Sequence, residues 1–428
     1  MNKLVYPSFN ETIFHEVLDN GLSVYLIPKK DYHKVFATFT TNYGSFDQSF
    51  VPINKDKKVN QPAGIAHFLE HKMFAMPDKT DAFEKLSSFG VNANAYTSFD
   101  RTSYLFSGTK NIEGALNYLL DYVQTPYFTP SSVKKEQGII AEELKMYQDY
   151  PNQRMFYGIL KNLYQKHPIN TEVGGTVDSI MKITAKKLYQ AYETFYHPSN
   201  MVLTLVGNFD ENEILTVIKE NQAKKTYGKA SPIVRFMKNE PKGIEKAYDE
   251  IEMPVVMPKL SIGVKLAPVS GKQALKDDLA FSILMDMYFS NSTKLYEKLL
   301  TQGLINDSFE HTTVQEDGAF MLAIFADTKD VDALSDVLIK QLVNLKRKKH
   351  DEQAFTRYKR SMLGSFVMSL NSLESISMGF TRYLANDVII YDIPEIIENI
   401  SLEDIDRVAK QINSKRISRY VIKPQKKN

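Results

Sequence analysis

The stretch Ala66-His67-Phe68-Leu69-Glu70-His71-Lys72 carries two histidines four residues apart, with a glutamate directly before the second. It follows Pro62, and we expect a helix over 63–73. Residues four apart lie on one face of a helix, so His67 and His71 can bind one zinc ion together. Glu70 projects to the same side, three residues after His67, where it can take a proton from a water on the metal.

A third ligand is expected, because catalytic zinc usually has three protein ligands and a water. The candidates lie in Glu136-Gln137-Gly138-Ile139-Ile140-Ala141-Glu142-Glu143-Leu144-Lys145, within a helix that we expect over 131–148. Glu136 and Glu143 are seven residues apart and share a helix face, whereas Glu142 points about 100° away. The spacing alone leaves Glu142 and Glu143 as rival ligands.

The remaining pattern alternates strands and helices. Asn20-Gly21 marks a hairpin turn within a β-rich run over 14–41, and the run 91–108 predicts a second strand pair. We further expect helices over 112–123, 185–195, 211–221, 277–287, 331–345, 351–370 and 402–412, and strands over 201–207, 259–266 and 417–422.

A weak internal repeat divides the chain into halves. The helix that begins near 183–188 and is followed by a strand recurs at 400–405, an offset of 217 residues. Between the halves, 222–246 is rich in Lys, Gly and Pro, as an extended connection would be. We therefore expect an α+β fold of two similar domains, 1–221 and 247–428, joined by a linker over 222–246. Each domain would be a mainly antiparallel sheet packed with helices.

Composition excludes several classes of protein. The 428 residues carry 53 basic and 51 acidic side chains, a net charge of +2 that gives no reason to expect a nucleic-acid or membrane partner. The absence of cysteine excludes disulfides, thiol nucleophiles and thiolate metal sites. Neither a signal peptide nor a long apolar run is visible, so we expect a cytoplasmic location.

From His67 to Glu143 the chain resembles the pitrilysin/insulinase zinc metallopeptidases, the inverzincins, whose motif is H-x-x-E-H. In that family a glutamate some seventy residues after the motif is the third zinc ligand, and another glutamate seven residues earlier supports it. The resemblance implies one zinc ion per chain, held by His67, His71 and Glu143. It also implies Glu70 as the general base and Glu136 as a supporting catalytic residue.

The resemblance extends to substrate binding. Asn92-Ala93-Asn94-Ala95-Tyr96-Thr97-Ser98 is similar to the edge strand on which these enzymes bind a peptide as an additional strand. It implies that Asn92, Ala93, Asn94 and Ala95 contact the substrate, with Asn94 closest to the scissile bond.

The second half departs from the pattern of self-sufficient relatives. The repeat offset places Leu284 opposite His67, so we expect no second metal site. Leu299 and Asn306 stand where such relatives have an Arg and a Tyr that hold the substrate and the oxyanion. Resemblance to the short, processing-peptidase-like branch therefore implies the zinc-bearing bacterial subunit of a heterodimer that cleaves peptides in a closed chamber. A zinc-less partner would supply the Arg/Tyr pair. A homodimer is the alternative assembly. The alternative function is a non-catalytic structural subunit of a protein assembly.

Overall fold

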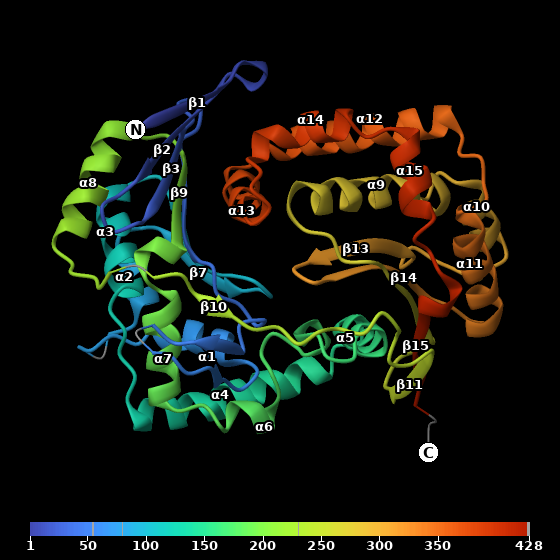
Figure 1. Cartoon of the computed structure of the whole chain (residues 1–428), viewed down its shortest axis with the longest axis horizontal. Helices are drawn as coiled ribbons and strands as arrows, with labels where there is room; N and C mark the ends of the chain where they lie inside the picture. Colours follow the sequence, from blue (N-terminus) through green and yellow to red (C-terminus); the bar gives the residue numbers. More distant parts are fainter. Residues whose placement is uncertain (54, 79, 230, 426–428) are drawn as a thin grey trace.

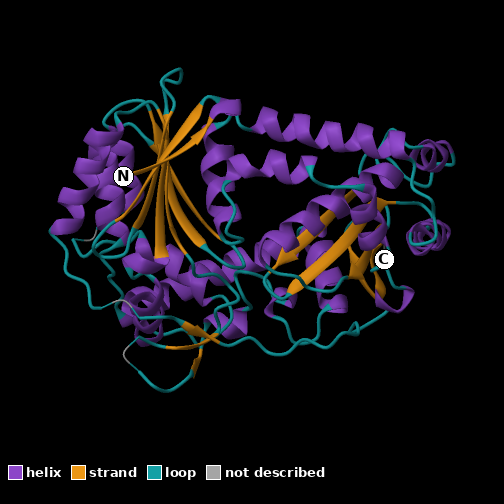
Figure 2. Cartoon of the chain, turned by 45° about the horizontal axis from the view of Figure 1, so that its top comes forward, coloured by secondary structure: helices purple, strands orange, loops and turns teal. Residues whose placement is uncertain are grey.

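The computed structural model describes residues 1–53, 55–78, 80–229 and 231–425. A twisted β-sheet forms the centre of the first half (Figure 2). It has seven strands in the order β1-β2-β3-β9-β4-β8-β7. Its neighbours are antiparallel except for β3 and β9, which are parallel. The strands are β1 (Asn2–Tyr6), β2 (Glu11–Val17), β3 (Ser23–Pro28), β4 (Val35–Thr41), β7 (Asn92–Thr97), β8 (Thr102–Gly108) and β9 (Met201–Gly207).

Helices of the first half cover one face of this sheet (Figure 1). They are α1 (Ile65–Met73), α2 (Ala82–Ser88), α3 (Ile112–Val123), α4 (Pro130–Gln148), α6 (Val177–Ile180), α7 (Ala185–Phe195) and α8 (Glu211–Ala223). A small separate sheet joins β5 (Ser49–Val51) and β6 (Val59–Asn60) to β10 (Val234–Arg235). The segment after α8 is thus tied back to the first half through β10.

The second half repeats this arrangement around a five-stranded sheet of order β11-β15-β12-β14-β13. The strands are β11 (Tyr248–Met253), β12 (Lys259–Lys265), β13 (Glu310–Glu316), β14 (Ala319–Asp327) and β15 (Ile417–Pro424). The helices are α9 (Gly271–Phe289), α10 (Lys294–Thr301), α11 (Val331–Leu345), α12 (Glu352–Ser369), α13 (Leu373–Leu384), α14 (Ile393–Glu398) and α15 (Leu402–Ala409). The order matches β3-β9-β4-β8-β7 strand for strand, including the one parallel pair. The predicted α+β fold of two similar domains is confirmed.

The two halves exchange one helix each. Helix α5 (Pro151–Leu163) follows α4 directly but packs on β12 and β15 of the second sheet. Helix α13 occupies the same place in the second half and packs on β4 and β9 of the first sheet (Figure 1). Each exchanged helix buries its apolar side chains against the other half's sheet, and each of these contacts forms a separate hydrophobic core. The exchange joins the two sheets into one molecule.

The predicted ends of six helices lie within two residues of the observed ends: α3, α4, α7, α8, α11 and α12. The sequence pattern did not predict α2, α5, α6, α10, α13 or α14, and it began α9 six residues late. Pro151 follows the helix predicted over 131–148, and a proline at that place ordinarily indicates that a helix has ended. Proline also suits the first turn of the next one, and Pro151 begins α5.

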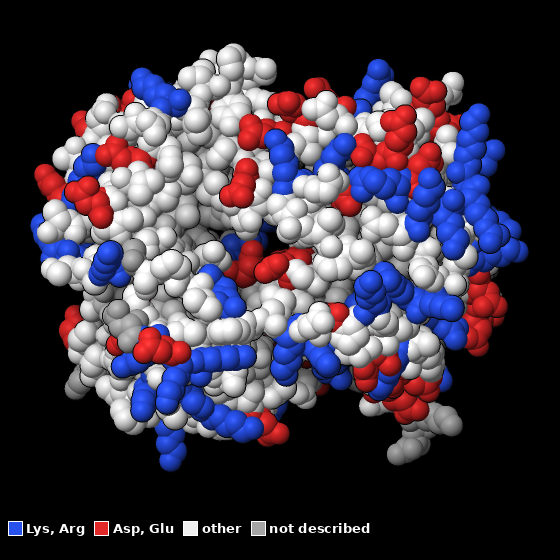
Figure 3. Space-filling view, in the orientation of Figure 1, with Lys and Arg blue, Asp and Glu red and all other residues white. Residues whose placement is uncertain are grey.

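Charged side chains of both signs lie side by side over the face shown in Figure 3, in keeping with the small net charge. Within the described residues, no helix combines the length and the apolar character that crossing a bilayer requires.

Candidate metal centre

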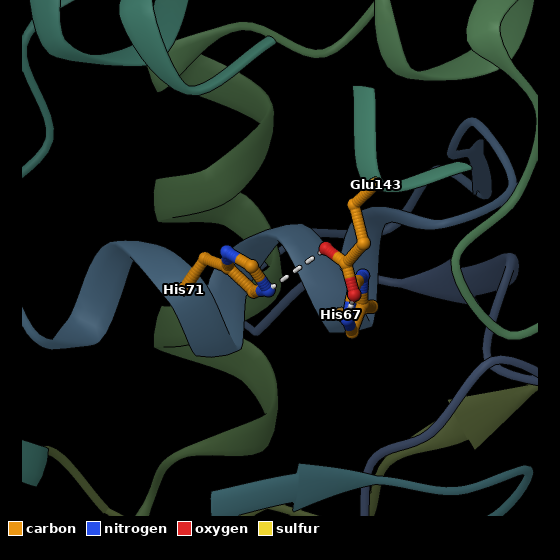
Figure 4. A group of neighbouring side chains, drawn as sticks. All are labelled: His67, His71 and Glu143. Atoms are coloured by element: carbon orange, nitrogen blue, oxygen red, sulfur yellow. Dashed lines mark ion pairs between the residues drawn. The ribbon is translucent and has the colours of Figure 1, made fainter. Parts of the chain in front are cut away.

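Three side chains from two helices converge at one point. His67 and His71 project from one face of α1, and Glu143 projects toward them from α4 (Figure 4). Glu143 Oε1 lies 3.8 Å from His67 Nε2, and Glu143 Oε2 lies 3.5 Å from His71 Nε2. Within the described residues, this is the one group of three His, Asp or Glu side chains close enough to share a metal ion.

The donor atoms fit zinc in kind and in spacing. Zinc in proteins prefers imidazole nitrogen and carboxylate oxygen among the ligands available to a chain without cysteine. Ligands about 2.0–2.1 Å from a tetrahedral ion lie about 3.3–3.4 Å from one another. The two observed separations of 3.5 and 3.8 Å are close to that value. The rival ligand Glu142 is instead 74% exposed and pairs with Lys145 at 2.7 Å.

Helix α1 is held in place by its own apolar face and by a close backbone approach at its start. Phe68 and Leu69 are fully buried in the hydrophobic core between the first sheet and its helices, which we call the first core. The two histidines therefore lie on the opposite, more open side of α1. The preceding residue, Gly64, has a positive φ of 85°. A Cβ at Gly64 would lie 2.2 Å from the carbonyl oxygen of Gly174, so only glycine allows this contact.

The two histidines differ in their electrostatic surroundings. Burial, followed by the neighbouring charge of His71, lowers the pKa of His67 to about 4, so this imidazole is neutral and keeps a lone pair. Burial alone would also lower the pKa of His71. The hydrogen bond to Glu136 and the charges of Glu143 and Glu70 outweigh it, and the pKa of His71 is raised.

Glu136 contacts His71 at Nδ1, the ring nitrogen that does not face Glu143. His71 Nδ1 lies 3.3 Å from Glu136 Oε1, and a hydrogen bond from this nitrogen leaves Nε2 free as an acceptor on the metal side. Lys72, only 3% exposed, places its ammonium 3.6 Å from the other oxygen of Glu136. The hydrogen bond from His71 and the charge of Lys72 outweigh the effect of burial, so the pKa of Glu136 is lowered and the carboxylate is ionised.

Glu70 lies beside the cluster and is 8% exposed. The hydroxyl of Thr97, the last residue of β7, donates a hydrogen bond of 2.5 Å to Glu70 Oε2. Burial raises the pKa of Glu70, and the bond from Thr97 opposes this in part. A raised pKa makes the carboxylate of Glu70 a stronger proton acceptor than an ordinary glutamate.

Glu143 also has a partner within its own helix. The hydroxyl of Tyr147, one turn further along α4, donates a hydrogen bond of 2.8 Å to Glu143 Oε1. Burial, followed by this bond, raises the pKa of Tyr147 to about 12, so the phenol keeps its proton at neutral pH.

Strand β7 forms the end of the first sheet, and β8 is its only partner strand within the described sheet. Its other edge therefore presents unpaired backbone groups. Ala93, Ala95 and Thr97 alternate onto the face of the strand that points toward α1, and the two alanines pack against the first core. Asn92 and Asn94 lie on the opposite face, and both are exposed.

In the second half, the two positions singled out by the sequence are Leu299 and Asn306, which stand where an Arg and a Tyr were looked for. Leu299 lies in α10 and is fully buried in the core of the second half. Asn306 follows α10, and its side-chain oxygen accepts hydrogen bonds from the backbone and hydroxyl of Ser308. Asn306 thus stabilises its own loop.

Sequence reasoning missed Lys72, Thr97 and Tyr147 as partners of the cluster. Tyr147 could have been found, because it lies four residues after Glu143 and so shares its helix face. Lys72 and Thr97 left no comparable signal. Each meets a carboxylate that is far away in the chain or in a different element, Glu136 in α4 and Glu70 in α1.

Comparisons with known proteins agree over most of the chain. The family model "Insulinase (Peptidase family M16)" matches residues 57–177, and "Peptidase M16 inactive domain" matches residues 182–362. The Bacillus subtilis protein named "Uncharacterized zinc protease YmfH" is 42% identical over 408 residues, which cover 95% of each chain.

Solved structures show the same fold. The crystal structure of an M16-like peptidase from Alicyclobacillus acidocaldarius is 33% identical, with a TM-score of 0.94, and the match covers 99% of this chain and 100% of that one. The periplasmic protease PqqL from Escherichia coli is 19% identical, with a TM-score of 0.77. That match covers 96% of this chain but 47% of PqqL, so PqqL is about twice as long.

Proposed function

This chain belongs to the insulinase family of peptidases, family M16, and from that premise we propose that it is a zinc-dependent endopeptidase. The observation that carries the proposal is the convergence of His67, His71 and Glu143, with Glu70 beside them. Three ligands leave a fourth position for water, which is typical of catalytic rather than structural zinc.

The residues have separate tasks in the proposed reaction. Zinc, when bound, acts as a Lewis acid that polarises the scissile carbonyl and lowers the pKa of water toward 7. Glu70 takes the proton from the attacking water and later delivers it to the leaving amine. Glu136 keeps His71 in the tautomer that presents Nε2, and Lys72 balances the charge of Glu136.

We further propose that the peptide binds along the free edge of β7. An extended peptide can add to this edge as one more strand, held by backbone hydrogen bonds through Asn92, Ala93, Asn94 and Ala95. Because Thr97 ends this strand and bonds Glu70, a peptide on β7 would lie next to the base. Backbone pairing of this kind requires an extended substrate, which favours peptides or unfolded segments.

The proposed active form is a dimer that encloses a chamber, with one zinc ion in this subunit. The buried Leu299 and the loop-bound Asn306 support a partner that supplies the substrate-holding Arg/Tyr pair. PqqL, of which this chain covers about half, supports the idea that the fold works together with a second half.

A second candidate is a non-catalytic structural subunit of an assembly. The match of residues 182–362 to the "Peptidase M16 inactive domain" model favours it for the second half alone. The complete set of His67, Glu70, His71 and Glu143 in the first half favours the peptidase.

The first test is cleavage of a mixed pool of unstructured peptides by the zinc-loaded chain, followed by mass spectrometry. The Glu70→Gln variant is the control, because it keeps all three ligands but lacks the base. We expect it to retain zinc and to lose at least about 10²-fold in turnover. Turnover of Glu70→Gln at the wild-type rate would remove Glu70 as the base.

The same pool tests the need for a partner. We expect the chain alone to cut slowly or not at all, and a homologous chain that lacks the zinc motif but carries the Arg/Tyr pair to restore cleavage. Full activity of the isolated chain would contradict the heterodimer. No cleavage in any combination would favour the structural subunit.

A further inference from the structure

We propose that Tyr147 is a positioning residue of the metal centre, whose hydroxyl holds the carboxylate of Glu143 in the orientation that binds zinc. The inference rests on the proposed function, because it assigns a role at the same centre. It adds an outer residue to the ligand that comes from α4, as Glu136 does for His71.

The geometry determines which group donates. Tyr147 Oη lies 2.8 Å from Glu143 Oε1, and the two residues are one helical turn apart in α4. An ionised carboxylate can only accept, so the phenol donates, and the bond is strengthened by the charge of the acceptor. The contact needs no other element, because residues four apart on a helix are neighbours.

The hydrogen bond from Tyr147 restricts the rotation of the Glu143 carboxylate. The last torsion of a glutamate side chain has a broad distribution, so the plane of a free carboxylate is poorly defined. The hydroxyl of Tyr147 engages Oε1, and Oε2 is then the oxygen that faces His71 Nε2 at 3.5 Å. Oε1 itself lies 3.8 Å from His67 Nε2, so the bond from Tyr147 fixes the carboxylate plane in the orientation in which its two oxygens face the two histidines.

Neighbouring residues distinguish this role from ordinary helix packing. Tyr150, three residues further, has its ring centre 6.3 Å from that of Tyr147 and is 51% exposed. Within the described contacts, Tyr150 makes no hydrogen bond to a ligand of the cluster. The chain therefore offers two neighbouring tyrosines, Tyr147 in the last turn of α4 and Tyr150 just after its end, and of these Tyr147 contacts Glu143.

The test is the zinc affinity of metal-free protein, measured by competition with a chromophoric chelator. Loss of an outer residue that orients a ligand typically weakens metal binding by about 10- to 100-fold, and we expect this for Tyr147→Phe. Tyr150→Phe, which removes the same atom nearby, should bind zinc as the wild type does. Wild-type affinity in Tyr147→Phe would overturn the proposal.

A second readout separates orientation of the ligand from stability of the helix. The visible absorption of the Co²⁺-loaded protein reports ligand geometry, and it should shift in Tyr147→Phe but not in Tyr150→Phe. An unshifted spectrum, with weaker binding explained by a lower unfolding temperature of the metal-free variant, would also overturn the proposal.

The outcomes keep the two proposals apart. Wild-type protein that binds zinc but cuts no peptide contradicts the peptidase and leaves the role of Tyr147 to be judged from the affinities. Cleaving wild-type protein with an unaffected Tyr147→Phe variant contradicts the role of Tyr147 alone.

Discussion

At the scale of a single residue, Thr97 links the edge strand to Glu70, the proposed general base. Its hydroxyl donates to Glu70 Oε2 at 2.5 Å, which fixes one carboxylate oxygen of the base. Thr97→Val removes this bond at nearly constant shape, so Glu70 is held less firmly. We expect kcat to fall by about 10- to 100-fold, since small displacements of a reacting group have effects of that size. Steady-state kinetics with one cleaved peptide measure it, and KM should change little.

Thr97→Ser is the matched control, because it keeps the hydroxyl and should restore most of kcat. Zinc content should be the same in both variants, since the described hydrogen bonds of the Thr97 hydroxyl go to Glu70 and Thr102 and to none of the three proposed metal ligands. Equal loss of kcat in the Val and Ser variants would show that the methyl group, and not the hydroxyl, is what matters.

At the scale of elements, the packing of the exchanged helix α5 on the second sheet depends on two glycines, one in the helix and one in the sheet. A Cβ at Gly158 would lie 2.3 Å from the ring of Tyr420 in β15. A Cβ at Gly263 in β12 would lie 2.5 Å from Ile159. The absence of side chains at these positions lets helix and sheet approach closely, and this contact holds the two halves together.

Gly158→Ala should therefore destabilise the protein, although alanine is the better helix former. Overpacking of a close contact costs about 1–3 kcal/mol, which exceeds the gain of about 1 kcal/mol in helix propensity. Urea unfolding measures the change in the free energy of unfolding. The control is Gly364→Ala in α12, where a Cβ would meet no atom within 4 Å. There we expect a small stabilisation, and a stabilised Gly158→Ala variant would contradict close packing at α5.

At the scale of the whole molecule, charged groups of both halves meet around Glu316 at the end of β13. A cavity of about 390 Å³ is lined there by Arg101 of the first half and by Asp278, Glu316 and Arg382 of the second. Burial, followed by the charge of Asp100, raises the pKa of Glu316 from 4.5 to about 7. Asp278 acts in the same direction as Asp100, while Arg101 and Arg382 oppose both.

The raised pKa makes a stability contribution that depends on pH. Between about pH 4.5 and 7 the folded protein keeps a proton on Glu316 that the unfolded chain has lost. The contribution of Glu316 is therefore fully present below pH 4.5, falls as the pH rises to about 7, and stays constant above that. Glu316→Gln should remove this part of the pH dependence and raise the unfolding temperature relative to wild type at pH 8.

Thermal unfolding from pH 4.5 to 8 measures this, with Glu310→Gln at the exposed start of β13 as the control. The control should follow the wild-type curve. A Glu316→Gln curve parallel to wild type over this interval would show that the carboxyl does not titrate there.

Most of the metal cluster was visible in the sequence because its components are local. Two histidines and a glutamate within one turn and a half of helix must share a side, and a capped helix with glutamates seven apart must present both on one face. Helix caps, turn residues and apolar periodicity act over a few residues, so α1, α4 and the strand pair β7–β8 followed from the pattern.

The contacts between distant segments depended on packing, which no local pattern records. Lys72 meets Glu136 across two helices, and α5 and α13 lie on the sheets of the opposite halves. An apolar helix face specifies that it must be buried but not against which sheet, because hydrophobic burial has no direction. The partners of the cluster and the union of the two halves were therefore decided by shape complementarity in the folded molecule.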